Sequence, residues 1–159
     1  MPKEVMERRA SDNEYLHKDF HGALSSALIY LEERFGAEAV REYLRGFARE
    51  YYAPVREEMA ERGLEAVADR LRRVYAEEGA DVRLELSGDT LTVEVEACPA
   101  VTHMRASGYE VAPLWSETIR SVNEALCEGS AYQFELLEYC EETGASVGRF
   151  SRREDGGGQ

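Results

Sequence analysis

The spacing of hydrophobic residues changes near residue 80 of this 159-residue chain, and that change constrains the fold more than any other feature. Up to Glu77, hydrophobic residues recur every three or four positions, as in helices that bury one face. From Val82 to Val95 they alternate with polar residues, and a Ser87-Gly88-Asp89 turn divides this stretch into a β-hairpin. The pattern therefore predicts a block of helices followed by strands.

Four helical segments are predicted before residue 80. The first begins near Asn13, where Ser11 or Asp12 can cap it, and Gly36 ends it. The second stops before Pro54, a short third piece runs to Gly63, and the fourth follows it. The faces expected to be buried are Leu24, Leu28, Leu31 and Phe35 in the first, Val40, Leu44, Phe47 and Tyr51 in the second, and Leu64, Val67, Leu71 and Val74 in the fourth.

The second half of the chain repeats the change from helix to strands. A loop is expected from Cys98 to Pro113, then a helix with Trp115 and Ile119 on its buried face, and then strands over 132–140 and 145–151. The fold class is α+β, with N-terminal helices packed on a four-stranded antiparallel sheet made of two hairpins joined by a helix. We expect a single domain over 13–152, a flexible N-terminus over 1–12 and a flexible tail over 153–159.

Charge and composition exclude several classes of partner. The formal net charge is −13 and the pI is about 4.7, which argues against binding nucleic acid or an anionic membrane. No stretch approaches the about 20 apolar residues of a membrane span, and no secretory signal is visible. Three cysteines, an odd number, argue against a disulfide framework and favour a reducing cytoplasm. No feature marks an oligomer interface.

The three histidines of the chain fall in two short motifs. His17 and His21 are one helical turn apart, at the edge of the hydrophobic face, while Asp19 points nearly the opposite way. Lys18 stands where a His-Glu-x-x-His metalloprotease has its glutamate, which excludes that class. The pair is either part of a polar site or two half-buried side chains that anchor the rim of the core.

The second motif is Cys98-Pro99-Ala100 with His103. Cys98 ends a strand and opens a loop, and strand alternation would place it on the face of Thr92 and Glu94. Its thiol is a nucleophile if a histidine lowers its pKa, a metal ligand if histidines converge on it, and otherwise a small buried hydrophobic group. Cys127 and Cys140 are expected to be packing residues.

Three further side chains are candidates for binding a substrate. Arg120 and Asn123 lie on one flank of the helix that follows Trp115. Arg120 could bind a carboxylate through two hydrogen bonds, and Asn123 could orient a neutral polar group. Arg105 is the alternative anchor for a carboxylate. For the flank that carries Arg120 and Asn123, a solvated surface is the simpler interpretation.

Several segments of the chain resemble the L-2-amino-thiazoline-4-carboxylic acid hydrolase-like proteins. The segments are 14–24 with its His-Lys-Asp-Phe-His block, Tyr30-Leu31, Phe35-Gly36, 51–54, the Cys98 corner with His103, and 123–126. The resemblance covers about residues 14 to 150, and it implies hydrolytic opening of a thiazoline ring to S-carbamoyl-cysteine. The C-terminal helix and hairpin also resemble vinyl-reductase-type domains, which bind small molecules without necessarily converting them.

The resulting hypothesis is a small-molecule hydrolase that opens a C–N bond of a cyclic amidine or amide. We expect the substrate to bear a carboxylate, held by Arg105 or Arg120. Either Cys98 attacks with His103 or His17 as base, or a histidine activates water. In a third route zinc, held by some of His17, His21, His103 and Cys98, supplies hydroxide. The competing hypotheses are a sensor domain without catalysis and a scaffold. All routes that combine the two motifs require the first helix to reach the Cys98 corner.

Overall fold

The structure is a computed structural model that describes residues 14–154, with side chains from Asp19 onward. The predicted caps Ser11 and Asp12 lie outside these residues. So do the whole of the predicted flexible N-terminus and most of the predicted flexible tail. The elements are α1 (Glu14–Phe35), α2 (Ala37–Tyr51), α3 (Ala53–Arg62), α4 (Leu64–Glu77), β1 (Arg83–Ser87), β2 (Thr90–Val95), α5 (Pro99–Ala106), α6 (Glu117–Cys127), β3 (Tyr132–Tyr139) and β4 (Ser146–Arg152).

The four strands form one antiparallel sheet in the order β1-β2-β4-β3. The two hairpins therefore lie side by side, with β2 paired to β4 in the centre; Val93, for example, is opposite Gly148. A register shift between Leu136 and Glu138 interrupts the pairing of β3 with β4. This arrangement confirms the predicted α+β class with two hairpins joined by helical structure.

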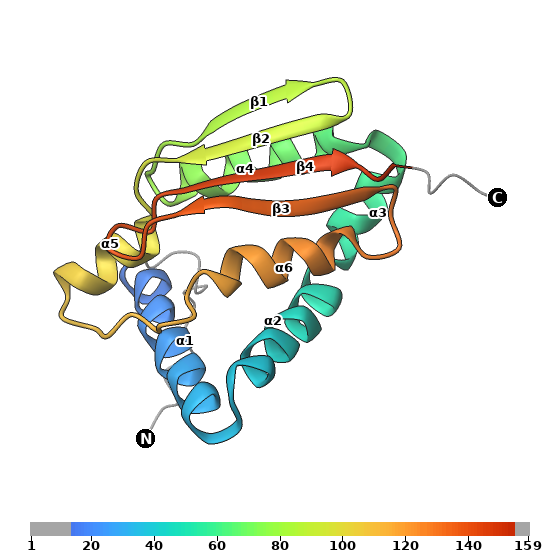
Figure 1. Ribbon diagram of the computed structural model, residues 1–159. Coiled ribbons are helices and arrows are strands. Elements are labelled where there is room, and N and C mark those ends of the chain that lie inside the picture. The colour runs from blue at the N-terminus through green and yellow to red at the C-terminus, as the bar shows by residue number, and fades with distance from the viewer. Residues whose placement is uncertain (1–13, 155–159) are drawn as a thin grey trace, which may run out of the picture.

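Helices cover one face of the sheet (Figure 1). α4 and α6 pack directly against the strands, and α1 and α2 form a V on the far side of α6. The core divides accordingly. One buried cluster, with Leu28, Leu44 and Trp115, joins α1, α2, α5 and α6. The other, with Met59 and Phe150, joins α3, α4 and α6 to the sheet.

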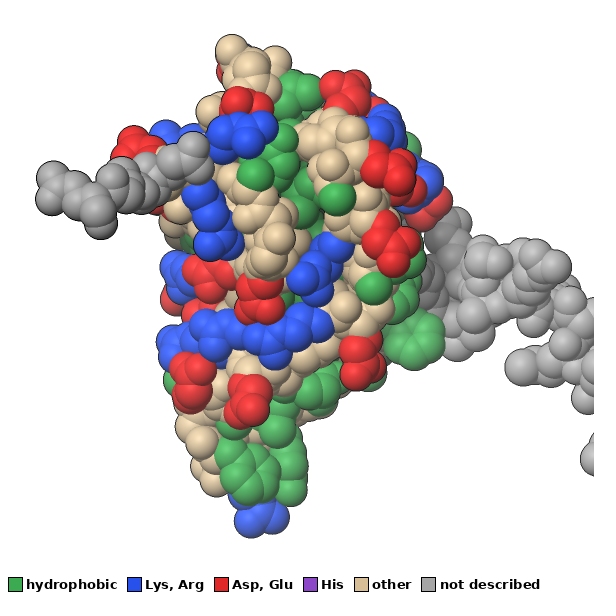
Figure 2. Space-filling model, turned by 90° about the vertical axis from the view of Figure 1, so that its right-hand side faces the viewer, with side chains coloured by type: hydrophobic (Ala, Val, Ile, Leu, Met, Phe, Trp, Pro, Cys, Tyr) green, Lys and Arg blue, Asp and Glu red, His purple; other side chains and the backbone are tan. Residues whose placement is uncertain are grey.

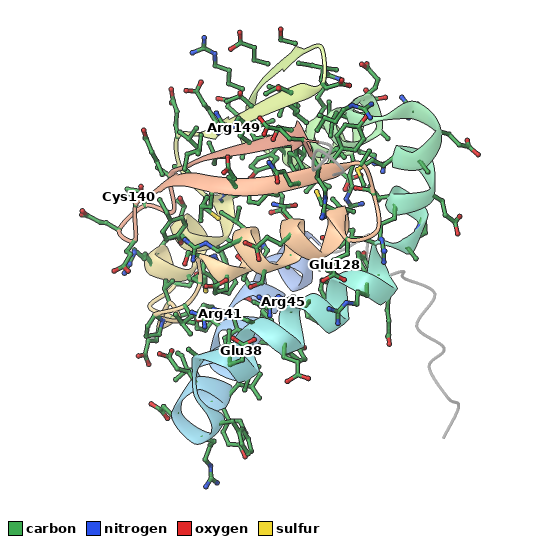
Figure 3. All side chains as sticks on the ribbon, turned by 45° about the vertical axis from the view of Figure 1, so that its right-hand side comes forward. Glu38, Arg41, Arg45, Glu128, Cys140 and Arg149 are labelled. Atoms are coloured by element: carbon green, nitrogen blue, oxygen red, sulfur yellow. The ribbon has the colours of Figure 1, made fainter. Side chains whose placement is uncertain are left out.

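The opposite face of the sheet is polar. Arg149 on β4 donates to Glu135 on β3 at 2.7 Å, and Arg83 lies 3.3 Å from Glu94 (Figure 3). Exposed pairs of this kind contribute about 0–1 kcal/mol each. This face is therefore a solvated surface, and the cavity described below lies on the helical side.

A band of ion pairs joins α2 to α6 (Figures 2 and 3). Arg49 donates to both carboxylate oxygens of Glu128, at 2.8 and 3.0 Å. Glu117 is only 1% exposed and accepts hydrogen bonds from Arg41 at 3.1 Å and Ser121 at 2.6 Å. A buried carboxylate needs such partners, because burial without them is costly.

Two sequence predictions about burial and local structure are wrong. The segment after Cys98 is not a loop throughout, since α5 occupies Pro99–Ala106 with a proline in its first turn, where a missing N–H costs nothing. Phe35, Phe47 and Tyr51 are 67%, 43% and 65% exposed rather than buried. In α2 the small Ala48, one turn after Leu44, faces the core in place of Phe47.

Among the described residues, the helices are each too short or too polar to cross a membrane.

Candidate functional site

A cavity of about 240 Å³ lies between α4, α6 and the helical face of the sheet. It is somewhat smaller than the roughly 300–1,000 Å³ of sites for drug-sized ligands. Most of its lining is hydrophobic, including Val93, Phe134 and Phe150. The polar or ionisable side chains that line it are His21, Tyr52, Arg70, Tyr75, Glu78, Cys98, Thr118, Asn123 and Ser146.

Cys98 lines this cavity and is held in place by the β3–β4 turn. Its backbone N–H donates to the carbonyl of Thr143 at 3.0 Å, and its extended backbone (ψ 122°) leads into α5. Gly144, with φ +68°, passes so close that a Cβ there would lie 2.5 Å from the Cys98 Cβ. β2 ends at Val95, so strand alternation does not extend to Cys98. The prediction that Cys98 shares a face with Thr92 and Glu94 is therefore wrong: it lines the cavity with Val93 and Val95.

The Cys98 thiol lies among hydrogen-bond donors but is mostly buried. Burial raises its pKa, and the hydrogen bonds from the N–H groups of Val101 and Ala100 and from the side chain of Trp115 only partly offset this. The nearby carboxylate of Glu78 raises the pKa further. The resting side chain is therefore a thiol at neutral pH, and it needs a base to become a nucleophile.

His21 brings α1 to this cavity. Its Nε2 lies 3.7 Å from Oε2 of Glu78, the residue that directly follows α4. The two side chains are 23% and 10% exposed. Tyr75, one turn earlier on α4, also lines the cavity, and its burial, with the charges of Cys98 and Glu78, raises its pKa to about 12. A thiol, an imidazole and a carboxylate thus line one cavity, which is the set of groups used in nucleophilic triads.

His103 lies elsewhere on the α1–α5 contact. Its Nε2 is 3.6 Å from Oδ1 of Asp19, and the Tyr109 hydroxyl is 3.5 Å from the same carboxylate oxygen. His103 is not among the residues that line the cavity. Asp19 therefore points away from His21, as the helical spacing predicts, and contacts the other histidine instead.

The predicted substrate-binding residues separate in the structure. Asn123 lines the cavity. Arg105 donates to the backbone carbonyls of Glu142 and Glu141 at 2.7 and 3.0 Å, and Arg120 donates to Glu117 at 3.1 Å. Neither arginine is among the cavity-lining residues. The guanidinium that does line it is Arg70, 4.3 Å from the centroid of the Tyr52 ring.

Sequence reasoning missed the contribution of α4. None of Arg70, Tyr75 and Glu78 is among the residues that the sequence indicates for the site. The available signal was spacing, since Glu78 follows Leu71 and Val74 by seven and four residues and so shares their face. That spacing identifies the face of α4 that carries Glu78, but not the cavity it lines.

The zinc hypothesis stays a prediction. His17 belongs to α1, but its side chain is not among those that the structure describes. In the described part of the chain no three His, Cys, Asp or Glu side chains are grouped as metal ligands. His21 and Cys98 line the same cavity, whereas His103 contacts Asp19.

No protein-family model matches the chain, and no curated protein sequence matches it. Its function therefore has to be inferred from the chemistry of the cavity.

Proposed function

We propose that the protein is a small-molecule hydrolase that opens a C–N bond of a cyclic amidine or amide by covalent catalysis from Cys98. The observation that carries the proposal is that Cys98, His21 and Glu78 line one cavity of small-molecule size. In it His21 is the base for the thiol and Glu78 orients the imidazole. The resemblance to the thiazoline carboxylic acid hydrolase-like proteins suggests 2-amino-thiazoline-4-carboxylate as the first substrate to test.

The chemistry on that substrate balances as follows. His21 takes the proton of the Cys98 thiol as sulfur adds to the ring carbon between nitrogen and sulfur. The proton passes to the ring nitrogen, the C–N bond breaks, and the carbon stays bonded to Cys98. Water then attacks this carbon, Cys98 leaves and regains a proton, and S-carbamoyl-cysteine is released.

Arg70 is the cation that we propose for the substrate carboxylate. Its guanidinium lies over Tyr52, an arrangement that holds the planar group in place and leaves its edge available for two hydrogen bonds. Asn123 on α6 is the proposed partner of a neutral polar group. In a chain of net charge −13, a local cation is needed to attract an anionic ligand.

The test is turnover of 2-amino-thiazoline-4-carboxylate, measured as S-carbamoyl-cysteine by mass spectrometry. We expect Cys98→Ala and Cys98→Ser to abolish turnover, and His21→Asn to reduce it by at least about 100-fold, as loss of a general base does. His103→Asn is the matched control, because His103 pairs with a carboxylate without lining the cavity. Full turnover in both Cys98 variants would refute the covalent route.

The same experiment distinguishes two alternatives to covalent catalysis by Cys98. If the Cys98 variants are active and the purified protein carries stoichiometric zinc by elemental analysis, the metal route replaces the covalent one. A sensor domain of vinyl-reductase-like type is favoured by the hydrophobic lining and by the protonated thiol. It predicts thermal stabilisation by the ligand with no product.

We also propose that the protein works in the cytoplasm. Cys98, Cys127 and Cys140 are all free, which suits a reducing compartment.

A further inference from the structure

The cavity that contains Cys98 is long and narrow. Three elements that run along the strands line it (Figure 1): α4 over residues 67–78, α6 over 118–126 and β4 over 146–150. At about 1.5 Å per helical residue and 3.3 Å per strand residue, each of them lines it for about 12–16 Å. Its volume of about 240 Å³ is nevertheless below the roughly 300–1,000 Å³ of sites for drug-sized ligands. A cavity of this length and volume fits an extended chain better than a compact ring system.

The charged side chains that line the cavity are well separated along α4. Glu78 lies 3.7 Å from His21, and its carboxylate is close enough to Cys98 to raise the pKa of that thiol. Arg70 is eight residues earlier, about 12 Å away along the helix, where its guanidinium lies 4.3 Å from the centroid of the Tyr52 ring. In the described part of the chain, the acidic and basic side chains that line the cavity, histidine aside, are Glu78 and Arg70. An anionic group is therefore attracted to Arg70 and repelled near Cys98.

Hydrophobic side chains from both helices and from the sheet line the cavity between Arg70 and Glu78. They include Leu71, Val74, Val93, Val122 and Phe134. Asn123 on α6 adds a polar side chain to this lining. Such a lining favours the burial of methylene groups and offers few partners to a polar ligand.

We propose that the cavity binds an unbranched apolar chain with a carboxylate at its end, the carboxylate at Arg70 and the chain running toward Cys98. At about 1.3 Å per methylene, from C–C bonds of about 1.5 Å, a length of about 12 Å corresponds to roughly eight to ten methylenes. In 2-amino-thiazoline-4-carboxylate three bonds, or less than about 5 Å, separate the reacting carbon from the carboxylate. As a statement about the substrate, the inference rests on the proposed function: the chain then joins the cyclic amidine or amide at Cys98 to the carboxylate.

Binding of unreactive straight-chain carboxylates tests the inference without turnover. Isothermal titration calorimetry compares hexanoate, octanoate, decanoate and undecanoate. We expect the association constant to rise by about fourfold per methylene, the equivalent of about 0.8 kcal/mol for each buried methylene. Adamantane-1-carboxylate has as many carbons as undecanoate but in a compact cage, and we expect it to bind at least about tenfold more weakly than undecanoate. Equal affinities for hexanoate and decanoate, or for the cage and the chain, would overturn the proposal.

Three variants of α4 locate the bound chain, and circular dichroism checks that each one folds. Arg70→Gln should weaken binding of every carboxylate in the series by about tenfold or more, because the charged hydrogen bonds are lost. Arg73→Gln is the matched control, since Arg73 is exposed on the same helix and does not line the cavity. Val74→Phe enlarges a lining side chain midway between Arg70 and Glu78, so it should weaken decanoate more than hexanoate. Decanoate binding that survives both Arg70→Gln and Val74→Phe would place the chain outside the cavity and refute the proposal.

Failure of chain binding and failure of the hydrolase give different results. If 2-amino-thiazoline-4-carboxylate is turned over but affinity does not depend on chain length, the hydrolase stands and the apolar chain is refuted. If affinity rises with chain length but the protein opens no cyclic amidine, the binding of an apolar carboxylate stands and the hydrolase is refuted. The calorimetric series needs no catalytic activity, because saturated carboxylates have no bond for Cys98 to attack.

Discussion

Replacing Gly144 by alanine should destabilise the protein through its contact with Cys98. Gly144 has φ +68°, and a Cβ at this position would lie 2.5 Å from the Cys98 Cβ and 2.9 Å from Cγ2 of Val101. Non-bonded carbons prefer about 3.5–4.0 Å, so one side must move by about 1 Å. The β3–β4 turn and the start of α5 are both held by hydrogen bonds, including Cys98 N–H to Thr143, and neither can yield freely.

The cost separates into two contributions. Alanine in a left-handed conformation costs about 1–2 kcal/mol, and the lower entropy of the unfolded chain returns about 0.4–1 kcal/mol. Overpacking at a well-filled position adds about 1–3 kcal/mol. Gly144→Ala should therefore lower the free energy of unfolding by roughly 2–4 kcal/mol. Since 1 kcal/mol corresponds to about 2–4 °C in a chain of this size, the melting temperature should fall by roughly 5–15 °C.

Gly79 provides the matched control. It has φ +66°, and a Cβ there would meet nothing within 4 Å. Gly79→Ala should therefore lower the free energy of unfolding by the backbone contribution alone, about 1 kcal/mol. Urea unfolding of both variants, followed by circular dichroism, measures the difference. If Gly144→Ala is within about 0.5 kcal/mol of Gly79→Ala, the turn does not press on Cys98 and the account of how the thiol is positioned is wrong.

Three further predictions concern other parts of the fold. Burial would raise the pKa of Glu117, but hydrogen bonds from Ser121 and Arg41 outweigh it and lower the pKa. The carboxylate therefore stabilises the protein above about pH 4.3, and this contribution is lost as the pH falls toward the lowered pKa. Glu117→Gln should lower the free energy of unfolding, measured in urea, by about 1–3 kcal/mol at pH 7. This free energy should also vary less with pH in the acid range than it does in the parent protein. Iodoacetamide should label Cys140 first, because hydrogen bonds from the hydroxyl and N–H of Thr143 and from a neighbouring backbone N–H lower its pKa. Mass spectrometry of tryptic peptides would locate the label. Earlier labelling of Cys98 or Cys127 would contradict this prediction. Leu28→Ala, at a fully buried position of α1, should cost about 2–5 kcal/mol in urea unfolding, and a cost below 1 kcal/mol would show that α1 is not docked in solution as described.

The periodic parts of the chain predicted the fold well. Alternation located both hairpins, and helical spacing located α1, α2, α4 and α6 within a few residues. Both signals are local, because a helix or strand that buries one face must repeat its hydrophobic residues at its own period. The error at α5 was also local. A proline disfavours the helical conformation for the residue before it, here Cys98, but proline in a first turn equally begins a helix.

Burial at the ends of helices could not be predicted in the same way. Phe35 and Tyr51 continue the spacing of buried residues, yet both are more than half exposed. Each stands at the last residue of its helix, beyond the surface that covers the preceding turns. Periodicity fixes the direction in which a side chain points, but a neighbouring element decides whether anything lies there.

The same distinction applies to the candidate site. The His-x-x-x-His spacing puts His17 and His21 on one side of α1, and this alone suggests a pair that acts together. In the folded chain the partner of His21 is instead Glu78, 57 residues further on at the end of α4, and His103 is paired with Asp19 on the opposite side of α1. Within a single turn, α1 thus makes two histidine–carboxylate contacts that point in different directions. Of these two contacts, only the one between His21 and Glu78 lines the cavity with Cys98. If His21 is the base for the Cys98 thiol, as we propose, His21→Asn should lower activity and His103→Asn should not, although either substitution removes a similar contact from α1.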